Sequence, residues 1–285
     1  MYVSPATLAM HLEIVKEYFT LIHLDEWLER VNAGRAVPSL ACAITFDDGW
    51  RDNYEYAFPI LRGAGAPATI YLVTDMVGEG YSFWPNTLAR YLGAGAADLA
   101  AYPTWLADIA RKLRLAVSPG IRALSTDEID EIIAECKISS TDAEMRDRVG
   151  SLVGAAHATP GPDLMSWEQV RSMSADDLVR FGSHTRRHTR LLPQLSEHEV
   201  RDEILGSIDV ISGHLSRKPR TFCYPNGDMS PAAVAAVREG YLGAVTTRRG
   251  WNRVASDRAL LKRVGVHEDV SAQPSAFISR LGGLG

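Results

Sequence analysis

Short apolar runs, rich in β-branched and aromatic residues, alternate with amphipathic segments along most of the chain. Apolar runs of this kind predict strands, whereas apolar residues spaced three and four apart predict helices that face a core. Regular alternation of the two is typical of an α/β fold, in which helices cover a parallel sheet or barrel. The predicted strands are residues 41–46, 68–73, 178–181, 221–223, 242–246 and 260–264.

Two of the predicted helices carry clear boundary signals. The longer covers about residues 196–217, where Ser196 and Glu199 form a capping box and the apolar residues fall on one face. The second begins at Ser230, which is followed by a proline, and ends at Gly240. Both helices lie between predicted strands, as strand–helix–strand units require.

The alternation lapses between about residues 78 and 165, where helical patterns dominate. One of these helices opens with a further capping box, formed by Ser125 and Glu128. We therefore expect a single domain over residues 1–285, with a mainly helical insertion at about 78–165 on its rim.

Charge and cysteine content narrow the class of protein. The chain has 30 Lys and Arg against 35 Asp and Glu, a net charge of -5. This argues against nucleic acid as a partner, because phosphate binding needs clustered cations. The three cysteines are far apart and form no Cys-x-x-Cys pair, so neither a disulfide framework nor a thiolate zinc site is expected.

The beginning of the chain does not resemble a signal peptide. Charged or polar residues, namely His11, Glu13, Lys16 and Glu17, interrupt the apolar stretch that such a peptide needs. No later run is long enough to span a bilayer as a transmembrane segment. A cytoplasmic protein is the expectation.

Two adjacent carboxylates, Asp47 and Asp48, follow the first predicted strand and precede Gly49. Side chains at the carboxyl ends of parallel strands gather where α/β folds bind substrates and metals. A turn at Gly49 could let both carboxylates converge. Asp-Asp-Gly is also common turn chemistry, so this pair alone does not establish a site.

His184 and His188 follow the predicted strand 178–181. A spacing of four residues is one helical turn, so both rings could lie on one face and reach a single metal ion. With a strand-end carboxylate they would form a two-histidine, one-carboxylate set. Such a set leaves positions open for water and substrate.

Residues 45–49 (Thr-Phe-Asp-Asp-Gly) and 184–188 (His-Thr-Arg-Arg-His) resemble the first two motifs of the polysaccharide deacetylases, also called NodB-homology or carbohydrate esterase family 4 proteins. The resemblance extends over about residues 40–75 and 165–270. It implies a distorted (β/α)7-type barrel of the NodB-homology fold. It also implies a hydrolase that removes N-acetyl groups from an N-acetylhexosamine-containing glycan or glycoconjugate.

The resemblance assigns roles to five residues. Asp48, His184 and His188 would bind a divalent metal ion, expected to be Zn²⁺, and Asp47 would act as general base on the metal-bound water. Thr185 would brace the second loop through a hydrogen bond. The roles suit the chemistry, because a zinc ion lowers the pKa of its water to about 7 and polarises the amide carbonyl.

Residues 220–227 (Arg-Thr-Phe-Cys-Tyr-Pro-Asn-Gly) resemble the family's third motif, which often reads Phe-Arg-Pro-Pro-Tyr-Gly. Cys223 stands where the usual arginine would orient the catalytic base. The backbone N–H of Asn226 would be the oxyanion donor, and Tyr224 would belong to the same oxyanion and substrate region. A Pro-Gly turn after a strand is the structural alternative.

The resemblance implies a general acid near the end of a late strand, and His267 would take this role by protonating the leaving amine. A lone histidine at a strand end is more often a surface or packing residue. No counterpart of the fourth motif is found, although Trp251 and Asp257 are candidates for parts of the site. Trp50 and Trp84 could pack against sugar rings, and core packing is an equal alternative for Trp84.

Two other functions stay open. Relatives of this fold with altered third motifs cleave a non-sugar amide or a cyclic imide, and Cys223 also fits a catalytically inactive carbohydrate-binding relative. Family members commonly carry a strand before the segment resembling residues 3–8, and this sequence has no counterpart of it. The expectation is either an opened barrel or a misassigned start. An opened edge could pair with another chain, which would give a homo-oligomer.

Overall fold

The computed structural model describes residues 3–79, 83–94, 102–115, 123–153 and 163–283. The chain divides into two compact units, one formed by Met1–Gly80 with Pro162–Gly285 and the other by Tyr81–Gly161. The second unit lies inside the stretch where strand–helix alternation lapses. All strands of the described residues belong to the first unit.

A six-stranded parallel sheet forms the centre of the first unit, and its strands lie side by side in chain order. This sheet, curled into a half-barrel, confirms the α/β fold expected from the sequence. Neighbouring strands in the chain are neighbours in the sheet, so all carboxyl ends meet at one edge. The strands are β3 (Ile44–Phe46), β4 (Ala68–Leu72), β5 (Val179–Ser183), β6 (Thr221–Cys223), β7 (Gly243–Arg249) and β8 (Leu261–Arg263).

The predicted strand 41–46 divides into two pieces that pair with different partners. β2 (Ala41–Cys42) pairs in parallel with β1 (Thr20–Leu21), whereas β3 pairs with β4. The backbone of this segment thus leaves a small sheet and enters the large one. Its second piece delivers the following residues to the edge where the strands end.

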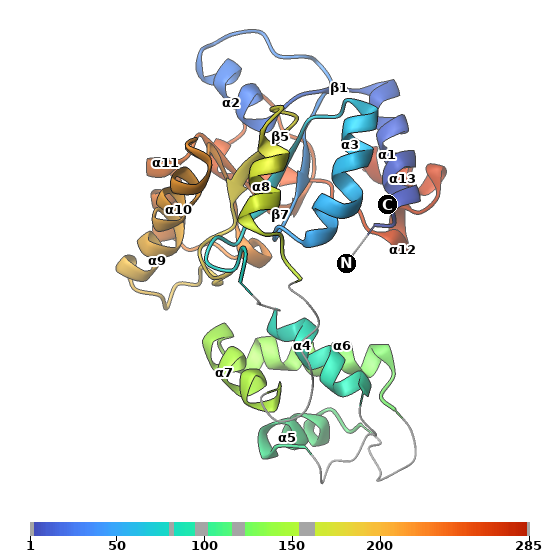
Figure 1. Cartoon of the computed structure of the whole chain (residues 1–285), viewed down its shortest axis with the longest axis vertical. Coiled ribbons are helices and arrows are strands. Elements are labelled where there is room, and N and C mark those ends of the chain that lie inside the picture. Colours follow the sequence, from blue (N-terminus) through green and yellow to red (C-terminus); the bar gives the residue numbers. More distant parts are fainter. Residues whose placement is uncertain (1–2, 80–82, 95–101, 116–122, 154–162, 284–285) are drawn as a thin grey trace. The chain divides into compact units, whose positions relative to one another are not determined.

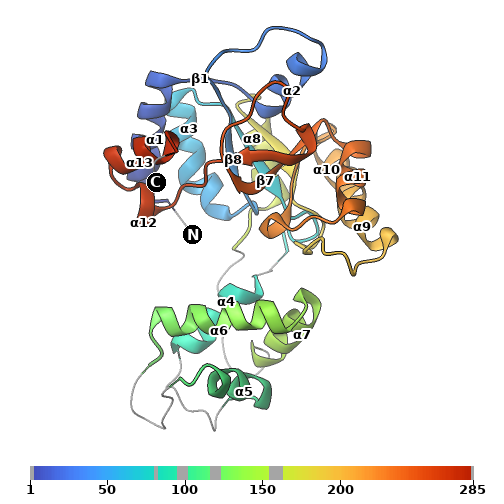
Figure 2. The same ribbon diagram turned by 180° about the vertical axis from the view of Figure 1, so that it is seen from behind.

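Helices connect the strands and lie outside the sheet. Figures 1 and 2 show α1, α3 and α13 at one side and α9, α10 and α11 at the other. The helices are α1 (Pro5–Tyr18), α2 (Leu24–Asn32), α3 (Phe58–Ala64), α8 (Trp167–Ser174), α9 (Glu197–Ile204), α10 (Gly206–Leu215), α11 (Pro231–Gly240), α12 (Glu268–Ser271) and α13 (Pro274–Leu281), with a π-helical turn at Asn53–Ala57 and 3₁₀ turns at Pro225–Gly227 and Arg258–Leu260.

The single helix predicted over 196–217 is two helices, α9 and α10. The chain keeps helical backbone angles at Leu205 but changes register at Gly206. Glycine weakens a helix, and the Ser207 hydroxyl donates to the Ile204 carbonyl at 2.7 Å, which bends helices at such positions. The capping box of Ser196 is present as predicted.

Apolar packing holds the strands of the half-barrel together. Strand β4 is buried at all five positions. A cluster that joins α2 to β4, β6, β7 and β8 comprises Leu24, Leu28, Tyr71, Cys223, Val245 and Leu261. This packing fixes the strand ends, and therefore the loops that follow them, in place.

The second unit is helical and has a hydrophobic core of its own. Its helices are α4 (Trp84–Ala94), α5 (Thr104–Lys112), α6 (Thr126–Ser139) and α7 (Asp142–Val153). Trp84 lies in this core, and its indole N–H donates to Asp142 at 3.1 Å. In the structure Trp84 is therefore a core residue and not an exposed platform for a sugar ring.

In the described segments, every helix is too short or too polar to cross a membrane.

Candidate active site

The turn after β3 holds both carboxylates of the first motif. Asp48 and Gly49 adopt left-handed backbone angles, with φ of 71° and 79°. A side chain at Gly49 would place its Cβ 2.8 Å from the Leu72 side chain, so glycine suits both the angle and the space. The turn redirects Asp48 away from the direction that an extended strand would give it.

The two histidines lie on a loop after β5, and this corrects the expectation that they share a helical turn. Residues 184–188 are not helical, and Thr185 and His188 have φ of 68° and 57°. The loop nevertheless brings the rings of His184 and His188 to 4.9 Å between centroids, at an angle of 71°. Loop geometry thus replaces the helical face.

Asp48, His184 and His188 converge on one point. Asp48 Oδ1 lies 3.5 Å from His184 Nε2 and 3.4 Å from His188 Nε2. This oxygen is buried and has no hydrogen-bond partner among the residues described. A buried oxygen facing two imidazole nitrogens fits a divalent cation, and the candidate ligand atoms of the three residues lie within 4.8 Å of one another.

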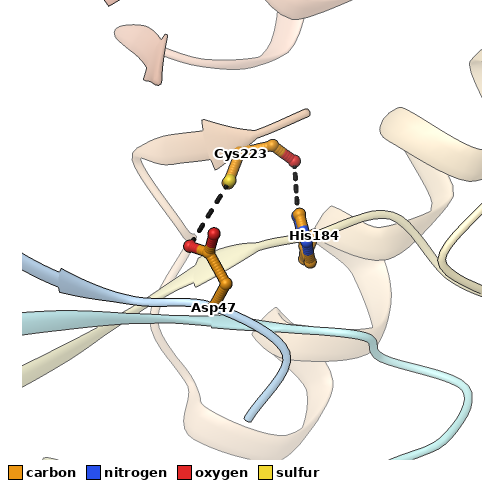
Figure 3. A group of neighbouring side chains, drawn as sticks. All are labelled: Asp47, His184 and Cys223. Carbon is orange, nitrogen blue, oxygen red and sulfur yellow. Dashed lines mark hydrogen bonds between the residues drawn. The ribbon is translucent and has the colours of Figure 1, made fainter. Parts of the chain in front are cut away.

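Hydrogen bonds fix the orientation of two of these three groups. His184 Nδ1 lies 2.7 Å from the carbonyl oxygen of Cys223 (Figure 3) and so carries the proton it donates. Its Nε2 is then the lone-pair nitrogen, the form a metal ligand needs. The indole N–H of Trp50 donates to Asp48 Oδ2 at 3.0 Å, which leaves Oδ1 facing the histidines.

Asp47 faces a different partner. Two N–H groups of Arg263 donate to its two carboxylate oxygens at 2.7 and 2.8 Å. Burial alone would raise the pKa of Asp47, but the charge and hydrogen bonds of Arg263, with smaller contributions from His184 and Cys223, lower this pKa to about 2. The Asp47 side chain is 34% exposed. An ionised, partly accessible carboxylate therefore lies beside the candidate metal ligands.

Arg263 is the residue that sequence reasoning missed. It extends from β8, donates to Asp47, and also donates to the Thr246 carbonyl at 2.9 Å and to Thr45 at 3.3 Å. It thus joins β3 and β8, which are the first and last strands of the large sheet. The available signal was an arginine near the carboxyl end of the predicted strand 260–264, close to the strand-end position at which Asp47 was found.

Cys223 is hydrogen-bonded both to His184 and to Asp47. Its thiol donates to Asp47 Oδ1 at 3.5 Å (Figure 3) and lies 3.4 Å from an Arg263 nitrogen. Burial, followed by the charge of Asp47, raises the pKa of Cys223 well above its usual value, so the thiol is neutral. The candidate ligand atoms of Asp47, His184 and Cys223 also lie within 4.8 Å of one another. The Arg263 charge on Asp47 makes this second set the poorer cation site.

Thr185 is fully buried within the loop it was expected to brace. Its hydroxyl donates to the His184 carbonyl, and its N–H donates to Ser183 Oγ at 3.2 Å. The structure therefore gives Thr185 a hydrogen bond to the backbone of a proposed metal ligand.

His267 is not joined to the other site residues. It precedes α12, and its Nδ1 lies 3.4 Å from Asp269. In the segments the structure describes, no hydrogen bond or ion pair links it to Asp47, Asp48 or the two histidines. Its assignment as general acid stays a prediction.

The remaining candidates occupy varied environments. Tyr224 is fully buried, its hydroxyl donates to the Ala259 carbonyl at 3.0 Å, and its main chain is hydrogen-bonded to Val245 and Gly227. Asn226 has a φ of 54° in the turn after β6. The indole N–H of Trp251 donates to the Leu281 carbonyl, and Asp257 pairs with Arg238, so neither is tied to the carboxylate and histidine cluster.

A parallel half-barrel with a carboxylate pair and two histidines at its strand ends defines a hydrolase of the NodB type. The sequence profile of the family described as Polysaccharide deacetylase matches residues 35–243, well over half of the chain. The chain belongs to the polysaccharide deacetylase family. It is therefore similar throughout its matched region to carbohydrate deacetylases.

One curated relative is similar over a short segment. A stretch of 43 residues is 48% identical to a protein of Bacillus subtilis (strain 168) named "Putative polysaccharide deacetylase YxkH". The match spans 15% of this chain and 15% of that protein. It supports the family assignment, and it gives no information on the rest of that protein.

Two solved structures share the fold over nearly the whole chain. IcaB from Ammonifex degensii is 19% identical with a TM-score of 0.63, covering 97% of this chain and 89% of its own. Streptococcus pyogenes deacetylase PplD, solved with acetate, is 17% identical with a TM-score of 0.61, covering 98% and 87%. These likenesses confirm the NodB-homology fold.

Proposed function

We propose that the chain is a metal-dependent hydrolase that removes N-acetyl groups from an N-acetylhexosamine unit of a glycan or glycoconjugate. One observation carries the proposal. The buried, unpartnered Oδ1 of Asp48 faces the Nε2 atoms of His184 and His188 at 3.4 to 3.5 Å. Family membership supplies the reaction class, and this geometry supplies a reason for metal dependence.

Asp48, His184 and His188 would hold the ion. Two neutral imidazoles and one carboxylate suit zinc and leave open positions. The chemistry that such an ion supplies is a polarised acetamide carbonyl and a water of lowered pKa. The hydrogen bonds of Trp50 and of the Cys223 carbonyl orient two of the three ligands before any ion binds.

Asp47 would accept the proton of the attacking water. Its low pKa keeps it ionised at neutral pH, and hydrogen bonds from Arg263 fix the orientation of its carboxylate group. A carboxylate with a pKa near 2 is a weak base, so proton transfer to it needs a water that is already acidified. The base and the proposed ion therefore depend on each other.

The leaving amine needs a proton as the C–N bond breaks. His267 is our proposal for its source, since it lies four residues after Arg263, which contacts Asp47. The backbone N–H of Asn226 would stabilise the oxyanion, and Trp50 would contact the sugar beside the ligand it orients.

Acetate release from a panel of N-acetylated sugars and oligosaccharides tests the proposal, with Asp47→Asn as the control. We expect release by the wild type that a chelator abolishes and added divalent metal restores, and almost none by Asp47→Asn. Activity on small cyclic imides or ureides alone would favour the amidohydrolase alternative. Sugar binding without turnover would favour an inactive relative.

A further inference from the structure

A single buried carboxylate from α9 holds the loop that carries both histidines. Glu203 is 2% exposed. Its Oε2 accepts the backbone N–H groups of Arg186 and Arg187, each at 3.0 Å. Its Oε1 accepts the Arg187 Nε–H at 2.7 Å and the Thr189 hydroxyl at 2.9 Å. The two peptide groups it binds lie between His184 and His188.

The loop needs such an acceptor because its backbone is neither helix nor strand. Thr185 and His188, on either side of the bound peptides, have left-handed φ angles that non-glycine residues rarely adopt without support. Buried peptide N–H groups outside regular structure must find a partner elsewhere. Glu203 provides that partner for the two N–H groups between the rings.

The opposite side of the loop is bound to the segment at the end of β4. The carbonyls of Thr185 and Arg186 accept from the N–H groups of Thr74 and Asp75 at 3.2 and 2.9 Å. The loop is therefore hydrogen-bonded on two sides. The segment after β4 binds its carbonyl groups, and Glu203 binds its N–H groups. Two fixed sides determine the separation of the two rings.

We propose that Glu203 is a positioning residue for the metal site, setting the geometry of His184 and His188 through the peptides between them. The inference rests on the proposed function in one respect, that these histidines hold an ion. It assigns to α9 a part in metal binding that the two sequence motifs do not contain.

Asp202 provides a matched control on the same helix. It pairs with the side chains of Arg186 and Arg187 at 2.6 and 2.8 Å. The loop peptides, by contrast, are bound by Glu203. If the arginine side chains alone mattered, loss of either carboxylate would have a similar effect. Under the proposal, only Glu203 affects the ion.

The test is the metal affinity of the metal-free full chain, measured by competition with a chromophoric zinc chelator. Glu203→Leu fills a similar space but offers no acceptor atom, so the two loop peptides lose their partner. We expect its zinc affinity to fall about 10- to 100-fold, as for loss of partners that orient metal ligands. Asp202→Asn should stay close to the wild type, and circular dichroism should show both variants folded.

Glu203→Asp carries the same test if the leucine variant does not fold, because it keeps the charge but cannot reach all four donors. Wild-type zinc affinity in a folded Glu203→Leu or Glu203→Asp would overturn the inference while leaving the proposed function intact. An equal loss in Asp202→Asn would overturn it as well. A wild type that binds no zinc would overturn the proposed function together with the inference.

Discussion

Arg263 contacts Asp47 as the arginine missing from the third motif is expected to do. Cys223 stands at the position of the family's arginine, and its small side chain leaves room for a guanidinium from β8. Arg263 fills that room and binds both oxygens of Asp47. The departure at Cys223 is thus paired with a compensating residue on another strand, which weakens the case for an inactive relative.

Arg263→Ala should lower kcat by about 10- to 100-fold while zinc binding persists, because Asp47 loses its orienting partner but the three ligands do not change. The double variant Arg263→Ala/Cys223→Arg should recover part of kcat, since it returns an arginine to the family's usual position. Steady-state kinetics with metal analysis measures both. An unchanged kcat in the single variant would show that Asp47 does not depend on Arg263.

The sequence was sufficient to predict the residues at strand ends but not their partners. Asp47, Asp48, His184 and His188 could be found because each follows an apolar run with recognisable spacing. Arg263 lies 216 residues from Asp47 in the chain. A contact over that separation has no local pattern in one sequence, and the same is true of the loop peptides bound by Glu203.

Strands and helices were predictable where propensity and periodicity agreed. The strand runs and the capping boxes of Ser125 and Ser196 are present in the structure. The break between α9 and α10, and the non-helical loop of the two histidines, were not predicted. The break follows from Gly206 and the local Ser207 hydrogen bond, whereas the histidine loop depends on tertiary hydrogen bonds from Glu203 and from the segment after β4.

Gly182 on β5 tests how closely the strands are packed beneath the site. A Cβ there would lie 2.6 Å from the Tyr71 ring and 2.7 Å from the Thr221 carbonyl. Gly182→Ala should lower the free energy of unfolding by about 1–3 kcal/mol through overpacking. Urea unfolding followed by circular dichroism measures it.

Gly213 on α10 is the matched control, because no atom lies within 4 Å of a Cβ built there. Gly213→Ala should raise stability by up to about 1 kcal/mol, since alanine favours a helix. If both variants changed the free energy of unfolding in the same way, the close packing described at Gly182 would be contradicted.

His11 couples α1 to the end of the chain and makes this contact sensitive to pH. Its Nε2 lies 2.7 Å from the Ser271 carbonyl and its ring stacks on Phe277. Burial lowers the pKa of His11 below 6.5, although the Ser271 hydrogen bond and Glu268 oppose this. The unfolded chain therefore binds a proton more readily, and stability should fall as the pH drops below about 6.5.

The measurement is the melting temperature from about pH 7.5 to about pH 5.5, compared with His11→Gln. Glutamine cannot titrate in this range, so the variant should lose less stability on acidification even if it starts lower. If the melting temperatures of the two proteins fell in parallel with pH, the pH dependence could not be assigned to His11.

At the scale of the whole molecule, the helical unit Tyr81–Gly161 has its own core and the half-barrel has another. We propose that the two units unfold separately. Leu106 is fully buried in the helical core, so Leu106→Ala should destabilise that unit by about 2–5 kcal/mol. Hydrogen exchange with mass spectrometry should show faster exchange in α4–α7 and unchanged protection in β4 and β5. Faster exchange in both units would indicate one cooperative fold.

Three predictions about the whole protein remain to be measured. A homo-oligomer follows from the idea of an opened sheet edge, and in the large sheet β3 and β8 are the edge strands. Cytoplasmic location also stays a prediction, and so does the division of the chain into one domain with an insertion.

The central claim is that Asp48, His184 and His188 hold one divalent ion beside the base Asp47. Zinc bound per chain, measured by mass spectrometry after metal-free protein is loaded and desalted, tests it most directly. We predict about one ion in the wild type and in Asp47→Asn, and almost none in His184→Ala. Equal loss of zinc in Asp47→Asn and His184→Ala would contradict the roles assigned to the two carboxylates.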